Sequence, residues 1–223
     1  LFRSSTILIA GYTDSKGKGK KDQWLVKLDL EGTQLWERTY GGINADRAIR
    51  AIPNKEGGAV VTGYETVSGP PNMMMMSVDQ YGKMLEKKYY GGGKSTQVGF
   101  ALDTLSDNRY LIAGARGISK EYSKGWLVAT KASGFKDWDL EFGPNAALTR
   151  ATGVANIDGN HFILAGHSVM VSGRRVLNKA WVARMGQSGE ELWRKTFQQE
   201  ANNKKNTLTP VPGNAYVATM KAV

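Results

Sequence analysis

The amino-acid sequence predicts an all-β fold built from repeats of about 52 residues, each containing four short strands. A glycine that closes an apolar run recurs at intervals of 52, 51 and 52 residues, at Gly11, Gly63, Gly114 and Gly166. A second glycine lies eight residues after the start of a later run, at Gly32, Gly82, Gly134 and Gly189. All six tryptophans occupy fixed places in this pattern. Four-stranded units of this length, repeated four times, are typical of a β-propeller.

Each unit contains four extended runs, which we name A to D in chain order. In the second unit they cover 46–52, 58–64, 73–79 and 84–90. The runs are rich in β-branched and aromatic residues and are bounded by Gly, Asn, Asp and Ser, as strands are. None sustains a 3.6-residue period. Run B is apolar on both faces, which indicates a strand between two layers. Runs C and D are joined by a turn that ends in glycine, because glycine adopts a positive φ without a steric penalty.

We expect one propeller over residues 1–223, or a part of a larger one. The repeats cover approximately 1–45, 46–96, 97–148 and 149–203, with a partial fifth repeat over 204–223. The first unit begins at run B, and the fifth supplies only runs A and B, at 205–211 and 214–221. Two closures stay open: the last strand completes the first unit, or the ring has five or more units.

Four consecutive methionines, Met73–Met76, stand in run C of the second unit. Met74, Met75 and Met76 align with Trp24, Leu25 and Val26 of the first unit. Successive side chains of a strand point to opposite faces, so the four thioethers divide two and two between different interfaces. The run therefore predicts core packing, for which flexible methionines are well suited, rather than a metal site.

Several other motifs are better explained by structure than by chemistry. The segment GGGKST at 91–96 aligns with a D–A loop and lacks the first glycine of a phosphate-binding loop. His161 and His167 are the only histidines, and six strand residues separate them by roughly 20 Å, too far to share a metal ion. Asp29 and Asp79 recur at C–D turns, where we expect them to cap the turn. The sequence thus offers no catalytic residue, metal ligand or cofactor site.

The chain has a net charge of +10, contains no cysteine and has 41% hydrophobic residues. It has no apolar run approaching the roughly 18 residues of a membrane helix, so we expect no transmembrane segment in it. A basic balance permits binding to an acidic protein, an anionic polysaccharide or nucleic acid. Nucleic acid is disfavoured because the lysines of SKGKGKKDQW lack interleaved aromatic residues.

The B–C loops are the long loops, and in a propeller they share one face with the D–A loops. They cover 14–22, 65–72, 117–124 and 168–178, with formal charges of +2, −1, +1 and +2. The C–D turns on the opposite face carry acidic residues. We therefore expect a basic binding face, since loops on a rigid scaffold commonly carry binding residues. The alternative, that these cations only keep the surface solvated, stays open. The candidate residues are Lys16, Lys18, Lys20, Lys21, Lys120, Lys124, Arg174 and Arg175.

The stretch KLDLEGTQLW followed by YGG resembles the repeats of bacterial secreted or lipoprotein β-propellers. It is also similar to the tryptophan-docking motif of quinoprotein-like propellers, in which Asp, Gly and Trp follow in order. Asp29, Gly32 and Trp36 keep that order, with one residue fewer between Asp and Gly. The resemblance implies that tryptophans lock adjacent blades together. The residues concerned are Trp24, Trp36, Trp126, Trp138, Trp181 and Trp193.

The same resemblance implies a function without catalysis or cofactor. It suggests a binding or scaffold propeller of the bacterial cell envelope that is periplasmic, anchored to the outer membrane or secreted. Its partner would be a protein or an anionic polysaccharide. The alternative is a carbohydrate-active or quinoprotein-like enzyme that uses the central channel of the propeller.

Overall fold

The computed structural model describes residues 6–119, 122–145, 147–172 and 175–199. They form fifteen strands and one short 3₁₀ helix at Ser106–Asn108, so the predicted all-β class is confirmed. The strands are β1 (Thr6–Thr13), β2 (Asp22–Asp29), β3 (Gln34–Tyr40), β4 (Arg47–Pro53), β5 (Ala59–Glu65), β6 (Asn72–Val78), β7 (Met84–Tyr90), β8 (Thr96–Thr104), β9 (Tyr110–Ile118), β10 (Lys124–Thr130), β11 (Lys136–Phe142), β12 (Ala147–Asn156), β13 (His161–Ser172), β14 (Arg175–Gly186) and β15 (Glu191–Gln199).

Strands that are consecutive in the chain pair with one another to give four antiparallel sheets. Sheet I contains β1–β3, sheet II contains β4–β7, sheet III contains β8–β11 and sheet IV contains β12–β15. Runs A to D of the second unit are the four strands of sheet II, within two residues at each end. Sheet I has three strands among the described residues, as expected for a unit that begins at run B.

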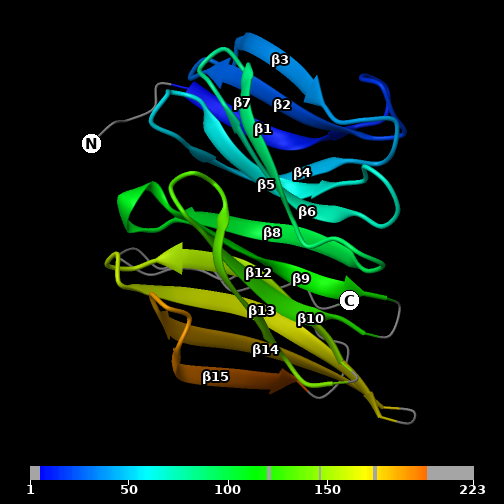
Figure 1. The fold of residues 1–223 in the computed structure, drawn as a ribbon, viewed down its shortest axis with the longest axis vertical. Helices are drawn as coiled ribbons and strands as arrows, with labels where there is room; N and C mark the ends of the chain where they lie inside the picture. The colour runs from blue at the N-terminus through cyan, green and yellow to red at the C-terminus, as the bar shows by residue number, and fades with distance from the viewer. Residues whose placement is uncertain (1–5, 120–121, 146, 173–174, 200–223) are drawn as a thin grey trace.

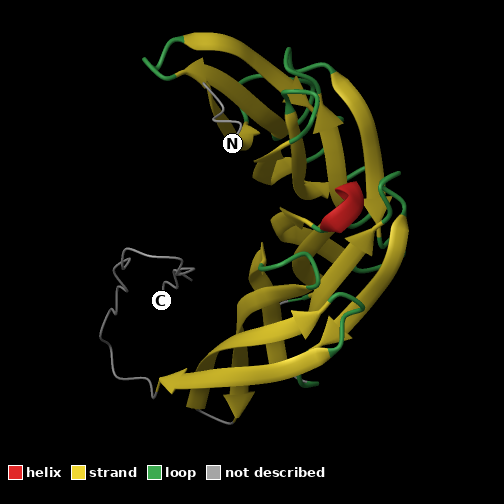
Figure 2. Cartoon of the chain, turned by 90° about the vertical axis from the view of Figure 1, so that its left-hand side faces the viewer, coloured by secondary structure: helices red, strands yellow, loops and turns green. Residues whose placement is uncertain are grey.

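The sheets follow one another face to face along an arc (Figure 2). Sheet I lies at one end of the long axis and sheet IV at the other (Figure 1). A closed ring is not formed by the described residues. The expected fifth unit, with runs at 205–211 and 214–221, lies outside them.

Three apolar cores lie between the four sheets, one at each interface. Met74 and Met76 belong to the core between sheets I and II, and Met73 and Met75 to the core between sheets II and III. All four are at least 95% buried. The predicted two-and-two division of the methionine run is confirmed, because β6 is an inner strand with a covered face on each side.

The C–D turns have the predicted construction. Asp29 Oδ1 accepts a hydrogen bond of 2.7 Å from the Thr33 N–H, and Asp79 Oδ1 accepts bonds of 2.9 Å from the N–H groups of Tyr81 and Lys83. Gly82 has a φ of +78°. The two aspartates therefore cap their turns, as expected.

The prediction of a fourth long loop over 168–178 is largely wrong. Strands β13 and β14 continue through this range and pair up to Ser172 and Arg175, so that each strand has twelve residues. The β-branched and apolar residues Val169, Val171 and Val176 favour strand over loop. The prediction placed a long loop where the two strands remain paired.

Candidate functional site

The B–C loop of each sheet is tied to the first strand of the next sheet by a recurring backbone hydrogen bond. The N–H of Asp46 donates to the Lys21 carbonyl at 2.7 Å, and the N–H of Gln97 donates to the Pro71 carbonyl at 2.9 Å. The N–H of Thr149 donates to the Ser123 carbonyl at 2.9 Å. These contacts fix the base of each loop at the end of the sheets where B–C and D–A connections meet.

The residues that donate these bonds have buried polar side chains with structural roles. Asp46 is fully buried, and its carboxylate accepts bonds of 2.7 Å from the N–H groups of Thr66 and Gly42. Burial raises the pKa of the Asp46 carboxyl, although the two backbone donors oppose this rise. Asp103, also from a run A strand, accepts a 2.7 Å bond from the Asn156 N–H. Both carboxylates are therefore engaged in holding backbone.

The first B–C loop carries the densest group of candidate cations. Asp22 is buried, and its Oδ2 accepts hydrogen bonds from the N–H groups of Lys18 and Gly19 at 3.1 and 2.9 Å. The carboxylate thus folds the loop back on itself. The side chains of Lys18 and Lys20 are exposed and form no hydrogen bond or ion pair with the described residues.

The two other lysines of this loop are engaged. Lys16 Nζ forms an ion pair of 2.7 Å with Glu37 Oε1, and Lys21 Nζ lies 5.0 Å from the centre of the Tyr12 ring. Glu37 also accepts a 2.6 Å bond from the indole N–H of Trp24. The hydrogen bonds from Lys16 and Trp24 lower the pKa of the Glu37 carboxyl.

The remaining candidate cations do not join this group in the part of the chain that the structure describes. Lys124 Nζ donates to the Gly143 carbonyl at 2.5 Å and to Asn145 Oδ1 at 2.9 Å, so it secures the D–A connection after its own sheet. Lys120 and Arg174 lie outside the described residues, and Arg175 begins β14. Among the candidate cations that the structure describes, only those of the first B–C loop therefore form a group.

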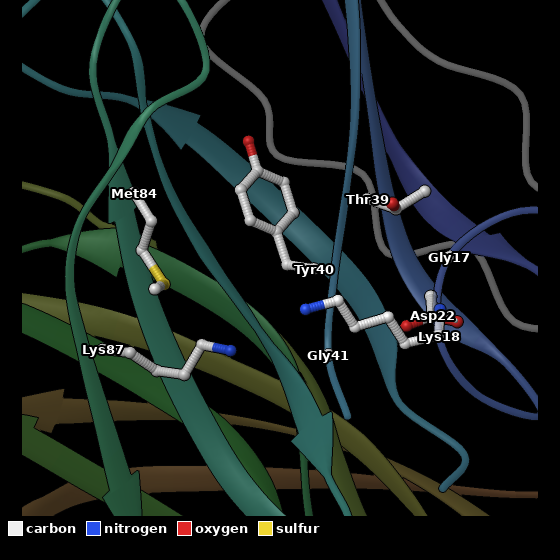
Figure 3. A pocket seen from close by; sticks show the side chains of 8 residues that line it. All are labelled: Gly17, Lys18, Asp22, Thr39, Tyr40, Gly41, Met84 and Lys87. Atoms are coloured by element: carbon white, nitrogen blue, oxygen red, sulfur yellow. Dashed lines mark hydrogen bonds between the residues drawn. The ribbon is translucent and has the colours of Figure 1, made fainter. Parts of the chain in front are cut away.

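A cavity of about 240 Å³ opens beside this loop, between sheets I and II. Lys18 and Asp22 lie on one side of it and Met84 and Lys87 on the other, with Tyr40 between them (Figure 3). Its lining is completed by Gly17, Thr39 and Gly41. Burial raises the pKa of the Tyr40 phenol to about 12, so the phenol stays neutral. The contributions of Tyr40, Met84 and Lys87 were not predictable from sequence spacing, because these residues stand in two different repeats.

Behind the cavity, Lys87 belongs to a partly buried network around the buried Glu65. Glu65 Oε2 accepts from Lys87 Nζ at 2.5 Å and from Gln23 Nε2 at 3.2 Å. The phenol of Tyr89 donates to Glu65 Oε1 at 2.8 Å. Burial and this hydrogen bond raise the pKa of the Tyr89 phenol. The charge of Lys87 is thus neutralised by Glu65, and a free cation at the cavity comes from Lys18.

The tryptophans fall into two groups: some contact residues of their own sheet, and others contact the next sheet. The indole N–H of Trp126 donates to Asp139 Oδ2 at 2.9 Å within sheet III. In sheet IV, Arg194 holds the position that corresponds to Asp139, and its guanidinium carbon lies 4.9 Å from the centre of the Trp181 ring. The indole N–H of Trp36 donates across the interface to the Gln80 carbonyl at 2.8 Å, and Trp138 packs on Gly189 of the next sheet. Trp193 has no following sheet among the described residues and is 41% exposed.

In the described ranges, no helix has the length and apolar character that a membrane span requires. Comparison of the sequence with protein-family models and with curated proteins finds no match.

Proposed function

We propose that the chain is a non-catalytic binding scaffold that presents the lysine loop, residues 14–21, to an anionic partner. The observation that carries the proposal is the contrast within this loop. Its backbone is held by Asp22 and by the bond to Asp46, while the side chains of Lys18 and Lys20 are exposed and have no partner among the described residues. A fixed loop with free cations loses little conformational entropy on binding.

We further propose that the curved row of sheets is part of a β-propeller and that it acts at the bacterial cell envelope. The repeated sheet-to-sheet stacking supports the first point, and the resemblance of the KLDLEGTQLW repeats to secreted or lipoprotein propellers supports the second. Acidic envelope polysaccharides and acidic protein surfaces carry the carboxylates or sulfates that would attract a chain with a net charge of +10.

The test uses an array of sulfated and uronic-acid oligosaccharides, together with a pull-down of envelope proteins. We expect the Lys16→Glu, Lys18→Glu, Lys20→Glu triple variant to lose binding to the retained probe, and we expect wild-type binding to weaken with added salt. The matched control reverses Lys55, Lys83 and Lys131, three exposed lysines in turns at the opposite end of the sheets. Equal loss in both triple variants, or no loss in either, would contradict a role for this loop.

A further inference from the structure

Neighbouring sheets are joined by a contact that recurs at each interface. The residue twelve positions after the start of run C lies over the glycine of the next C–D turn. A Cβ added at Gly82 would lie 3.1 Å from the Trp36 ring, and one at Gly189 would lie 3.1 Å from the Trp138 ring. At Gly134 the corresponding neighbour is Glu86 Oε2, at 3.4 Å. The preceding sheet therefore packs closely on the turn glycine wherever it covers the turn.

An aromatic residue four positions further along the same strand completes the joint. The phenol of Tyr40 donates to the Gly82 carbonyl at 2.5 Å, and the phenol of Tyr90 donates to the Gly134 carbonyl at 2.6 Å. Phe142 holds this place in sheet III and packs edge-on against Trp181, with ring centres 5.2 Å apart. Each joint thus has two halves. The aromatic side chains on the last strand of one sheet are called the donor half, and the turn glycine with the sheet face beside it on the following sheet is called the acceptor half.

The far face of sheet IV carries an unmatched donor half. Trp193 and Phe197 hold the places of Trp36 and Tyr40, and they are 41% and 59% exposed, whereas Tyr90 is 4% exposed at an interior joint. Lys195 between them corresponds to Arg38, whose stem lies against Gly82. Aromatic side chains that are buried or half-buried at the interior joints are thus exposed at this end.

The opposite end, on sheet I, carries an unmatched acceptor half. A Cβ added at Gly32 would have no atom within 4 Å, although Gly32 has the same positive φ as the covered glycines. Ile9 is 44% exposed, while its counterparts Val61, Ile112 and Leu164 are fully buried. The turn around Gly32 also carries Asp29 and Glu31, which are opposite in charge to Lys195.

These two halves lie at opposite ends of the arc, so the described residues do not join them within one chain (Figure 1). We propose that they join between chains: sheet I of a second copy docks on sheet IV, with its Gly32 turn under Trp193. The occupant is a second copy because this chain itself carries the matching half, with complementary charge, and three interior joints show the fit. Such a head-to-tail contact gives a ring if the rotation closes and an open chain if it does not.

The experiment is sedimentation velocity of the full chain across micromolar concentrations. The wild type is expected to form species larger than a 24.4 kDa monomer as concentration rises. Phe197→Glu disrupts the donor half, and Ile9→Glu disrupts the acceptor half. Each variant alone should therefore be monomeric. An equimolar mixture of the two should form a dimer and nothing larger, because one intact joint remains. Leu85→Glu, at an exposed residue of β7, is the control and should assemble like the wild type.

Circular dichroism of each variant establishes that it is folded, which the exposure of the substituted side chains favours. A wild-type chain that stays monomeric at all concentrations overturns the proposal and indicates that residues 200–223 or another protein cover the end. Assembly abolished by only one of the two variants also overturns it, because that result requires an interface between identical ends. A mixture that remains monomeric overturns it as well.

Discussion

Met74 and Met76 lie in the core between sheets I and II, which also contains Leu25 and is flanked by Trp36. An unbranched thioether fits such an irregular space, and Leu fills a similar volume. The cost of a substitution at these two residues should therefore follow the volume that is lost rather than the loss of sulfur.

We expect Met74→Ala or Met76→Ala to lower the free energy of unfolding by about 2 to 5 kcal/mol, because each leaves a cavity. Met74→Leu should cost less than about 1.5 kcal/mol. Met84→Ala is the control, since Met84 is 47% exposed, and it should change stability little. Urea unfolding measures all four values. A Met74→Leu loss as large as that of Met74→Ala would point to a role for the sulfur itself.

His167 lies opposite Arg150 in the ladder between β12 and β13. Burial and the Arg150 charge lower the pKa of its imidazole below the ordinary value of 6.5. The unfolded chain therefore binds more protons than the folded one as the pH falls below 6.5, so the free energy of unfolding should decrease there. Chemical unfolding at several pH values measures the slope, and His167→Gln should flatten it. An unchanged slope in the variant would assign the dependence to other groups.

At the scale of elements, a C–D turn is a local structure that also serves as a docking surface. Gly82 and Gly32 have φ values of +78° and +87°, but only Gly82 is covered, by Trp36 and the stem of Arg38. The two glycines thus share a backbone requirement and differ in what they contact. This pair separates the energy of the turn from the energy of the joint.

We expect Gly32→Ala to cost about 1 to 2 kcal/mol, the usual penalty of a left-handed conformation for alanine. Gly82→Ala should cost more, by about 1 to 3 kcal/mol, because its Cβ must also displace the Trp36 ring. Thermal unfolding of the two variants at low protein concentration gives the difference. Equal losses would show that the joint tolerates a methyl group and that the close approach matters little.

At the scale of the molecule, a row of sheets that contact only their neighbours distributes stability unevenly. The middle strands β5, β6, β9 and β10 are buried over most of their length, whereas β1, β3 and β15 expose many side chains. The two end sheets each have one uncovered face in the described structure. The outer sheets should therefore open more readily than the inner ones.

Native-state hydrogen exchange at sub-micromolar concentration, where self-association is weakest, measures this gradient. We expect the amides of β5, β6, β9 and β10 to exchange slowest and those of β3 and β15 to exchange fastest. Strands β1 and β15 should gain protection at high concentration if copies dock end to end. Uniform protection at every concentration would contradict both the gradient and the exposed ends.

Much of the fold was predictable because its signals are local and repeated. The 52-residue spacing of Gly11, Gly63, Gly114 and Gly166 defined the units, and strand alternation divided the methionine run correctly. The candidate lysine loop was visible as a charge cluster at 16–21. The predicted loop at 168–178 was wrong over most of its length, because β-branched residues continue β13 and β14 through this range.

By itself, the sequence determined the strands, their order, the turn glycines and the aromatic residues that recur with them, since each depends on neighbours within one unit. Only the tertiary structure brought Gln23, Glu65, Lys87 and Tyr89 together and paired Trp36 with Gly82. It also decided which repeats are covered and which are open. Those outcomes depend on how one sheet packs on the next, which no spacing within a repeat encodes.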